Sequence, residues 1–146
     1  MGETLLYPQE AEAILTAAEL EGAGATMITY SMQSGGFLYS GHDAGPLMGQ
    51  LENWGAAAVG FNCVAADGMV PHLVSKLRRF TKLPLICKPN AGNPIINEKG
   101  QAEYKLEPEP FARIVKACYE NGASFLGGCC GTTPAHMAAL KKSLDR

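Results

Sequence analysis

The sequence predicts an α/β fold in which short parallel strands alternate with helices that cover the sheet. Short apolar runs rich in β-branched residues recur along the chain, and amphipathic segments with helical spacing separate them. Strands that are apolar on both faces are typical of a parallel sheet buried under helices. Gly-Ala pairs at 24–25, 55–56 and 122–123 each precede a strand, which indicates one repeated unit.

The helices are predicted from apolar residues at helical spacing and from start and stop signals. The first begins at Pro8, because proline suits a first helical turn, and ends at the glycines of 22–24. Similar proline and glycine signals bound the later segments. The predicted helices span residues 8–24, 44–54, 68–81, 108–122 and 133–144.

The predicted strands lie between these helices, so that the order along the chain is αβαβαβαβα. They span residues 25–32, 56–64, 83–92 and 123–130. Two architectures fit this order: an open doubly wound sheet, or half of a (β/α)₈ barrel, which typically has about 250 residues. No G-x-G-x-x-G motif follows the first predicted strand, so a dinucleotide-binding fold lacks its main support.

Composition excludes several classes of protein. The net charge of −2 and the isoelectric point near 5.9 provide no basic surface for nucleic acid or an anionic membrane. The apolar runs are shorter than the ~20 residues of a membrane span, and the N-terminus lacks the pattern of a signal peptide. Five cysteines without regular spacing do not form a secreted disulfide framework. We therefore expect a cytoplasmic protein without nucleic-acid or membrane partners, whose cysteines are buried thiols, metal ligands or redox groups.

Three cysteines lie at the carboxyl ends of predicted strands, where chemistry gathers in parallel α/β folds. Cys63 ends the second strand, and Cys129 and Cys130 end the fourth. Neighbouring strand residues point to opposite faces, so this pair can share a ligand only if the glycines of 127–131 let the chain leave the strand. Three thiolates leave one tetrahedral position open, as in catalytic zinc sites, and soft sulfur donors favour zinc over magnesium or calcium.

Several motifs resemble one family. "GFNC", "KPNAGNP" and "GGCCGTTPAHMAAL" are similar to the homocysteine-binding domain shared by cobalamin-dependent methionine synthase and the betaine- or S-methylmethionine-homocysteine methyltransferases. "KPNAG" and "EYKLEPEPFA" are most similar to the methionine synthase branch. The resemblance covers practically the whole chain. It implies that residues 1–146 are a single partial domain, the second half of a (β/α)₈ barrel from its fourth helix through its eighth βα unit.

The resemblance also implies an activity and a set of site residues. The family's three zinc-ligating cysteines fall on Cys63, Cys129 and Cys130. Asn90 falls where the methionine synthase branch has an asparagine whose oxygen approaches the metal without substrate, and we expect Asn62 and Asn90 to contact substrate. Zinc would hold homocysteine as a thiolate that attacks a methyl donor to give methionine. Cobalamin or folate would enter only indirectly, through other domains that supply the methyl group.

The sequence departs from the family in the part of the barrel that it covers. The family carries a D-G-[GA]-x-G-T loop after its first strand and an acidic residue after its fourth, and both help to hold the amino acid. We expect neither here, because "MGETLLYPQE" is predicted to begin within the fourth unit. Four parallel strands also leave two unpaired edges. We therefore expect a homodimer, or a partner chain that completes the barrel.

Two other interpretations of the site remain open. The chain can be a catalytically inactive half-barrel that only binds zinc or thiols, or Cys129 and Cys130 can form a redox-active vicinal disulfide. Cys87 and Cys118 are interpreted as core thiols.

Other polar residues are given structural interpretations. Lys88 at a strand end either meets a carboxylate or extends over the surface. The three histidines, His42, His72 and His136, are interpreted as surface or capping groups.

Overall fold

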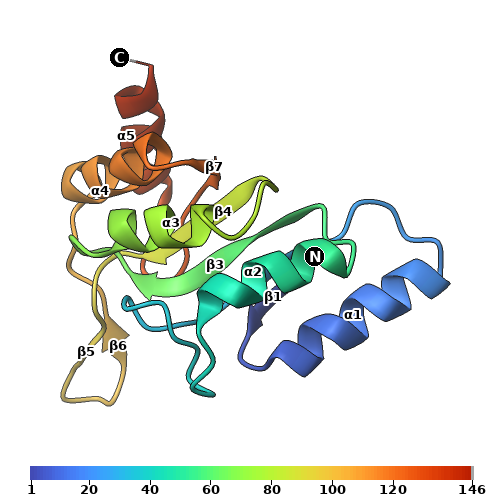
Figure 1. Cartoon of the computed structure of the whole chain (residues 1–146). Helices are drawn as coiled ribbons and strands as arrows, with labels where there is room; N and C mark the ends of the chain where they lie inside the picture. Colours follow the sequence, from blue (N-terminus) through green and yellow to red (C-terminus); the bar gives the residue numbers. More distant parts are fainter. Residues whose placement is uncertain (146) are drawn as a thin grey trace.

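The structure is a computed structural model that describes residues 1–145 (Figure 1). Five strands form one parallel sheet in the order β1-β2-β3-β4-β7, and β5 and β6 form a separate antiparallel hairpin. The elements are β1 (Gly2–Leu5), α1 (Pro8–Leu20), β2 (Met27–Tyr30), α2 (Ala44–Asn53), β3 (Ala58–Ala65), α3 (Val70–Arg78), β4 (Leu85–Asn90), β5 (Ile95–Ile96), β6 (Ala102–Glu103), α4 (Pro108–Glu120), β7 (Ala123–Leu126) and α5 (Pro134–Leu144).

The strand order decides between the two architectures. Each new strand of the large sheet joins the same side of the previous one, whereas a doubly wound sheet reverses direction at a switch point. Because crossovers between parallel strands are right-handed, a constant direction places the connecting helices on one face. Consecutive helices indeed contact one another in chain order (Figure 1). The prediction of parallel βα units in barrel order is confirmed.

The number of strands was predicted wrongly. β1 pairs in parallel with β2, with Gly2 opposite Ile28 and Leu5 opposite Tyr30. Its sequence, "GETL", has no apolar run, so periodicity does not reveal it. The chain therefore includes a strand before the first predicted helix, and that strand carries an acidic residue, Glu3.

The predicted ends of several elements also move inward. Glycines terminate α1 one turn before the predicted boundary, and β7 ends at Leu126 rather than at residue 130. Cys129 and Cys130 consequently lie beyond the strand, as sharing one ligand requires. No helix among residues 1–145 has the length and apolar character that crossing a bilayer demands.

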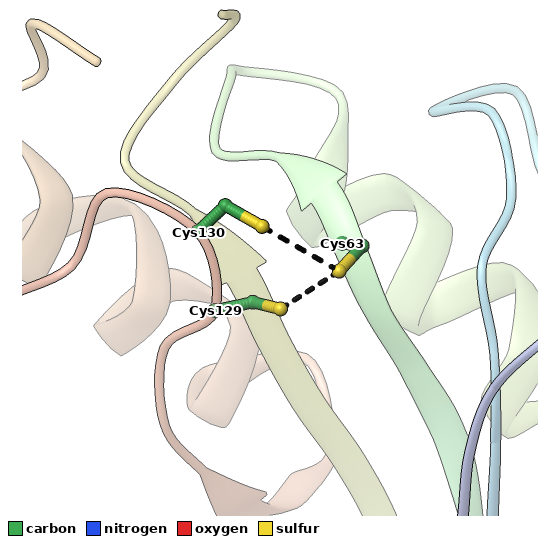
Figure 2. A group of neighbouring side chains, drawn as sticks. All are labelled: Cys63, Cys129 and Cys130. Atoms are coloured by element: carbon green, nitrogen blue, oxygen red, sulfur yellow. Dashed lines mark hydrogen bonds between the residues drawn. The ribbon is translucent and has the colours of Figure 1, made fainter. Parts of the chain in front are cut away.

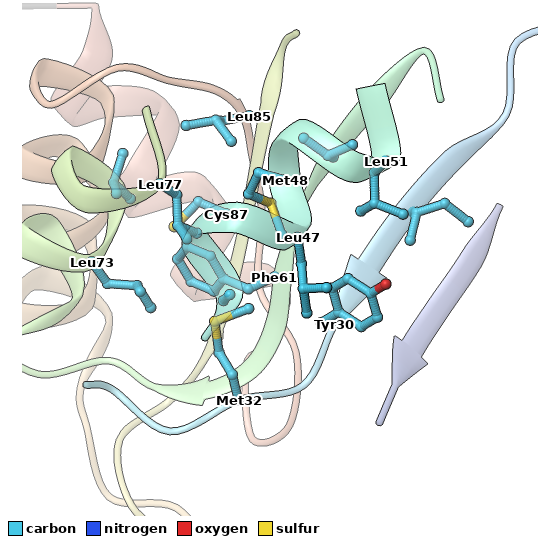
Figure 3. Packing of buried hydrophobic residues seen from close by; sticks show 14 of the residues in the cluster. Tyr30, Met32, Leu47, Met48, Leu51, Phe61, Leu73, Leu77, Leu85 and Cys87 are labelled. Atoms are coloured by element: carbon cyan, nitrogen blue, oxygen red, sulfur yellow. The ribbon is translucent and has the colours of Figure 1, made fainter. Parts of the chain in front are cut away.

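The core fills the space between the sheet and its helices (Figure 3). Tyr30 of β2 and Phe61 of β3 are fully buried there with Met48 of α2 and with leucines of α2 and α3. Cys87 and Cys118 are fully buried in the same cluster, which confirms their interpretation as core thiols. The residues that alternate with these along the strands, including Thr29 and Asn62, face the other side of the sheet. This side is called the concave face below.

Gly60 sets the spacing at the centre of the concave face. A Cβ atom at this position would overlap the main chain of Ile86 on β4. No side chain larger than hydrogen fits between these strands, so glycine is required here for close approach.

Candidate metal centre

Three cysteine sulfurs meet above the carboxyl end of the sheet. The Sγ atom of Cys63 lies 2.7 Å from that of Cys129 and 3.9 Å from that of Cys130. All three sulfurs lie within 4.8 Å of one another. Figure 2 shows the Cys63 side chain rising from the end of β3 toward the two cysteines of the segment after β7. The structure thus brings together the three residues that the sequence motifs indicate.

An irregularity at the end of β3 aims Cys63 at this site. Its φ of 57° is left-handed, and the register with β4 shifts between Asn62 and Ala65. In a regular strand Asn62 and Cys63 would point to opposite faces, but this bulge turns both toward the same side. A left-handed conformation costs a non-glycine residue about 1–2 kcal/mol. Packing must hold the residue in place.

The end of β4 fixes the pair after β7. The Cys129 N–H donates to Pro89 O at 2.9 Å, and Ala91 N–H donates to Cys130 O at 2.9 Å. The side chain of Asn90 adds a third link, because its Oδ1 accepts the Cys130 N–H at 3.0 Å. The cysteine segment therefore continues to pair with β4 after the strand has ended. The approach of Asn90 to a metal or substrate stays a prediction. In the structure its side-chain oxygen accepts the hydrogen bond from the Cys130 main chain.

Asn62 is fully buried beneath the sulfurs. Its Oδ1 accepts from Thr29 Oγ1 at 2.8 Å and from Thr4 N at 3.0 Å. Its Nδ2 donates to Thr4 Oγ1 at 2.6 Å and faces the sulfurs of Cys63 at 3.4 Å and Cys129 at 3.7 Å. The acceptor contacts fix which end of the amide points to the sulfurs, so a donor faces any negative charge there. Contact between Asn62 and substrate stays a prediction.

The proton affinities of the thiols differ because the sulfurs are so close. Burial, followed by the hydrogen bond and charge of Cys129, raises the pKa of Cys63 to about 12. Burial also acts to raise the pKa of Cys129, but hydrogen bonds with Cys63, Asn62 and the Cys130 backbone outweigh it and lower this pKa overall. Cys129 is therefore the member of this pair that loses its proton more readily.

The donor set fits zinc. Sulfurs held about 2.3 Å from a tetrahedral zinc lie about 3.8 Å apart, close to the 3.9 Å between Cys63 and Cys130. The Cys63–Cys129 pair at 2.7 Å would open by about 1 Å around such an ion. Cys130 is exposed, so the cluster has an open side. A soft cation would bind the deprotonated sulfurs and offset the repulsion among three thiolates.

The histidines do not join this cluster within the described part of the chain. His136 caps α5: its Nδ1 bonds to Thr133 and its Nε2 lies 2.8 Å from Leu106 O. His42 is exposed and bonds to Ser40, and His72 is exposed. Their interpretation as surface or capping groups is confirmed.

Sequence reasoning missed three residues near the sulfurs. Thr4 bonds to Asn62, and Glu3 forms an ion pair with Lys88 at 2.6 Å. Lys88 therefore meets a carboxylate, one of the two roles considered for it. Tyr104, from the loop between β6 and α4, packs on Gly131, the residue after Cys130. The "EYKLEPEPFA" motif contains this tyrosine, but its contact with the site needs the folded loop.

Comparisons with known proteins agree with this architecture. The sequence pattern of the family described as homocysteine S-methyltransferase matches residues 1–144. Methionine synthase of Mycobacterium leprae is 31% identical over 117 residues, which are 80% of this chain and 10% of that protein. Homocysteine S-methyltransferase YbgG of Bacillus subtilis is 29% identical over 97% of this chain and 46% of that protein.

A solved structure gives the same picture in three dimensions. The homocysteine methyltransferase MmuM of Escherichia coli, in its metallated form, superimposes with a TM-score of 0.75 at 27% identity. The match covers 96% of this chain and 43% of that one. The chain thus spans about half the length of this enzyme and of YbgG, and a tenth of the methionine synthase. It belongs to the homocysteine S-methyltransferase family.

Proposed function

We propose that this chain is the part of a zinc-dependent homocysteine S-methyltransferase that holds the metal and the reacting sulfur. The observation that carries the proposal is the convergence of Cys63, Cys129 and Cys130 at the carboxyl edge of the sheet, with one side open. These residues would hold the ion. Bound zinc supplies a Lewis acid that keeps a substrate thiol deprotonated at neutral pH.

The other residues of the chain prepare the site for that sulfur. Asn62 directs an N–H toward the cysteines and so moderates their negative charge. Asn90 fixes the main chain of Cys130 and, in this proposal, also approaches the ion or substrate. Glu3 is the acidic group on β1, and we assign it the role that the family gives to an acidic residue after its fourth strand. It would bind the ammonium group of homocysteine.

The proposed reaction transfers a methyl group to the homocysteine sulfur and yields methionine. Cobalamin or folate would take part only as a methyl donor carried by other domains. The proposed setting is the cytoplasm, and a second copy or a partner chain is proposed to complete the barrel.

Metal analysis with a matched variant tests the site. Protein purified without chelator should contain about one zinc per chain, and a Cys129→Ser, Cys130→Ser double variant should contain little. Cys118→Ala, which removes a buried thiol outside the cluster, should retain full zinc. Equal zinc content in the double variant and the wild type would contradict the proposal.

Two measurements, thiol binding and product formation, distinguish an active methyltransferase from a half-barrel that only binds zinc or thiols. In cobalt-substituted protein, homocysteine should strengthen the sulfur-to-metal charge-transfer band by adding a fourth sulfur. Methionine should form when a methyl donor and any required partner chain are supplied. A half-barrel that only binds zinc or thiols would give the spectral change but no methionine with any donor.

A further inference from the structure

A closed ring of hydrogen bonds joins the exposed cysteine of the cluster to two distant segments. Ala91 N–H donates to Cys130 O at 2.9 Å, and Leu106 N–H donates to Ala91 O at 3.2 Å. Leu106 O in turn lies 2.8 Å from Nε2 of His136, whose Nδ1 accepts from Thr133 N–H at 3.1 Å. Thr133 follows Cys130 by three residues in the sequence, which closes the ring.

His136 takes part in this hydrogen-bonded ring through its side chain, and its partners fix which nitrogen carries the proton. A main-chain N–H can only donate, so Nδ1 is the acceptor toward Thr133. A carbonyl oxygen can only accept, so Nε2 carries the proton and donates to Leu106. The side chain is only 6% exposed, and its imidazole meets Phe111 edge-on with centroids 5.3 Å apart. The imidazole is therefore held in one orientation with both nitrogens in use.

Helix capping accounts for only one of the two bonds of His136. The Nδ1 contact with Thr133 belongs to the capping box of α5. The Nε2 contact with Leu106 joins residues 30 positions apart and satisfies no group of α5. Leu106 lies at the end of the connection between β4 and α4, and its bond to Ala91 closes the base of that connection. His136 therefore links this base to α5.

The backbone around Cys130 has little restraint of its own. Glycines precede and follow the cysteine pair at positions 127, 128 and 131, and Gly131 is left-handed with a φ of 76°. Glycine restricts the backbone less than any other residue. The main chain of Cys130 is held by its neighbours instead, because Asn90 Oδ1 accepts its N–H at 3.0 Å and Ala91 N–H donates to its carbonyl. The position of Cys130 thus depends on the position of Ala91.

We propose that His136 is a positioning residue for the metal centre and that it acts on Cys130 through the base of the β4–α4 connection. Its Nε2–H holds that base against α5, and the base holds the main chain of the exposed cysteine. The inference rests on the proposed function, because it concerns a metal bound by the three cysteines. Replacing residues that orient a metal ligand without touching the metal typically lowers metal affinity by about 10–100-fold.

Two variants of equal size separate the link to Leu106 from the helix cap. Gln and Glu at position 136 can both complete a capping box with Thr133. The Gln amide also has an N–H that can donate to Leu106 O, whereas a carboxylate has none. His136→Glu should therefore lose the link, and His136→Gln should retain most of it. The negative charge of Glu would attract a cation, so weaker metal binding by this variant cannot be a charge effect.

The first measurement is amide hydrogen exchange in the metal-free protein, which reports on the hydrogen-bonded ring directly. His136→Glu should accelerate exchange at Ala91 and Leu106 about tenfold, as expected when one hydrogen bond is lost. His136→Gln should change these rates little. The amide of Val59, which donates to Pro84 O at 3.1 Å outside the ring, is the internal control. Unchanged exchange at Ala91 in His136→Glu would contradict the link.

The second measurement is cobalt affinity, followed by the charge-transfer band in competition with a chelator. Wild type and His136→Gln should bind cobalt alike, and His136→Glu should bind it about tenfold more weakly. Unaltered affinity in His136→Glu, or equal weakening in both variants, would overturn the proposal and leave His136 as a helix cap alone. Absence of cobalt binding by the wild type would instead overturn the proposed function, and this inference with it.

Discussion

Cys63 and Cys129 place their sulfur atoms 2.7 Å apart although 66 positions separate them in the sequence. Cys63 ends β3 and Cys129 follows β7, and β4 lies between these strands in the sheet. Two strand spacings amount to about 10 Å. Both thiols must therefore lean over the end of β4, and the bulge at Cys63 turns its side chain in that direction.

The left-handed backbone of Cys63 predicts an unusual order of stability among its variants. Cys63→Gly and Cys63→Ala both remove the sulfur, but only glycine adopts a φ of 57° without steric cost. Cys63→Gly should therefore be about 1 kcal/mol more stable than Cys63→Ala in denaturant unfolding of the metal-free protein. In a regular strand glycine is the less stable of the two. A Cys63→Gly variant that is less stable than Cys63→Ala would therefore contradict the bulge.

Gly60 predicts a steric effect at the centre of the sheet. Gly60→Ala would drive a methyl group into the main chain of Ile86 and should destabilise the protein by about 2–3 kcal/mol. Gly24→Ala is the matched control, since a Cβ atom there meets nothing within 4 Å. Thermal and urea unfolding of both variants measure the difference. Equal stability of the two would show that β3 and β4 are less closely spaced.

Asp43 predicts a pH dependence of stability. Its carboxylate caps α2 through Gly45 N–H at 2.9 Å and pairs with Lys76 at 2.9 Å. The hydrogen bond with Lys76, followed by that with Gly45, lowers the pKa of Asp43. A lowered folded-state pKa contributes stability above the unfolded value of about 3.9, and this is lost as the pH falls through the folded value.

Two variants of Asp43 separate the cap from the charge. Asp43→Ala should cost about 1 kcal/mol at neutral pH, because the cap is lost. Asp43→Asn keeps an acceptor and should cost only about 0.5 kcal/mol, since the pair with Lys76 is partly exposed. The difference between wild type and Asp43→Asn should disappear in urea unfolding well below pH 3.9. If the two proteins still differ in stability at that pH, the difference does not come from the ionised Asp43 carboxylate.

The β7 edge predicts self-association. Phe125 on this edge strand is 49% exposed. It is in register with Ile86 of β4, so the two side chains lie on the same face of the sheet. An unpaired apolar strand edge tends to associate. Sedimentation at micromolar concentration should detect dimers or larger species, and Phe125→Lys should reduce them. Leu20→Lys on α1, an exposed apolar position at 81%, is the control that should change nothing. A single monomeric species with cooperative unfolding would contradict the expected partner surface.

The parts of the structure that the sequence predicted are those whose signal is local. The helices follow from spacing and caps, and the central strands follow from apolar runs. The cysteine cluster follows from a general rule, that the carboxyl ends of parallel strands share one edge. None of these predictions requires knowing which distant segments pack against each other.

The parts that were missed depend on contacts between distant segments. β1 has only four residues and little apolar content, and it is a strand because β2 offers its hydrogen-bonding edge. The φ of Cys63 depends on register with β4, which no pattern in "GFNC" encodes. The Glu3–Lys88 contact depends on sheet curvature over positions 85 apart. Such features require the assembled sheet.

A metal ion bound by the three cysteines would also cross-link distant parts of the chain. Cys63 and Cys130 are 67 positions apart, so metal coordination would close a loop that contains α3, β4, the β5–β6 hairpin, α4 and β7. A disulfide closing a loop of that length would stabilise the fold by about 4 kcal/mol on chain-entropy grounds. Because the loop includes the edge strand β7, chelation should loosen that edge first, and amide exchange in β7 should then accelerate more than in β2.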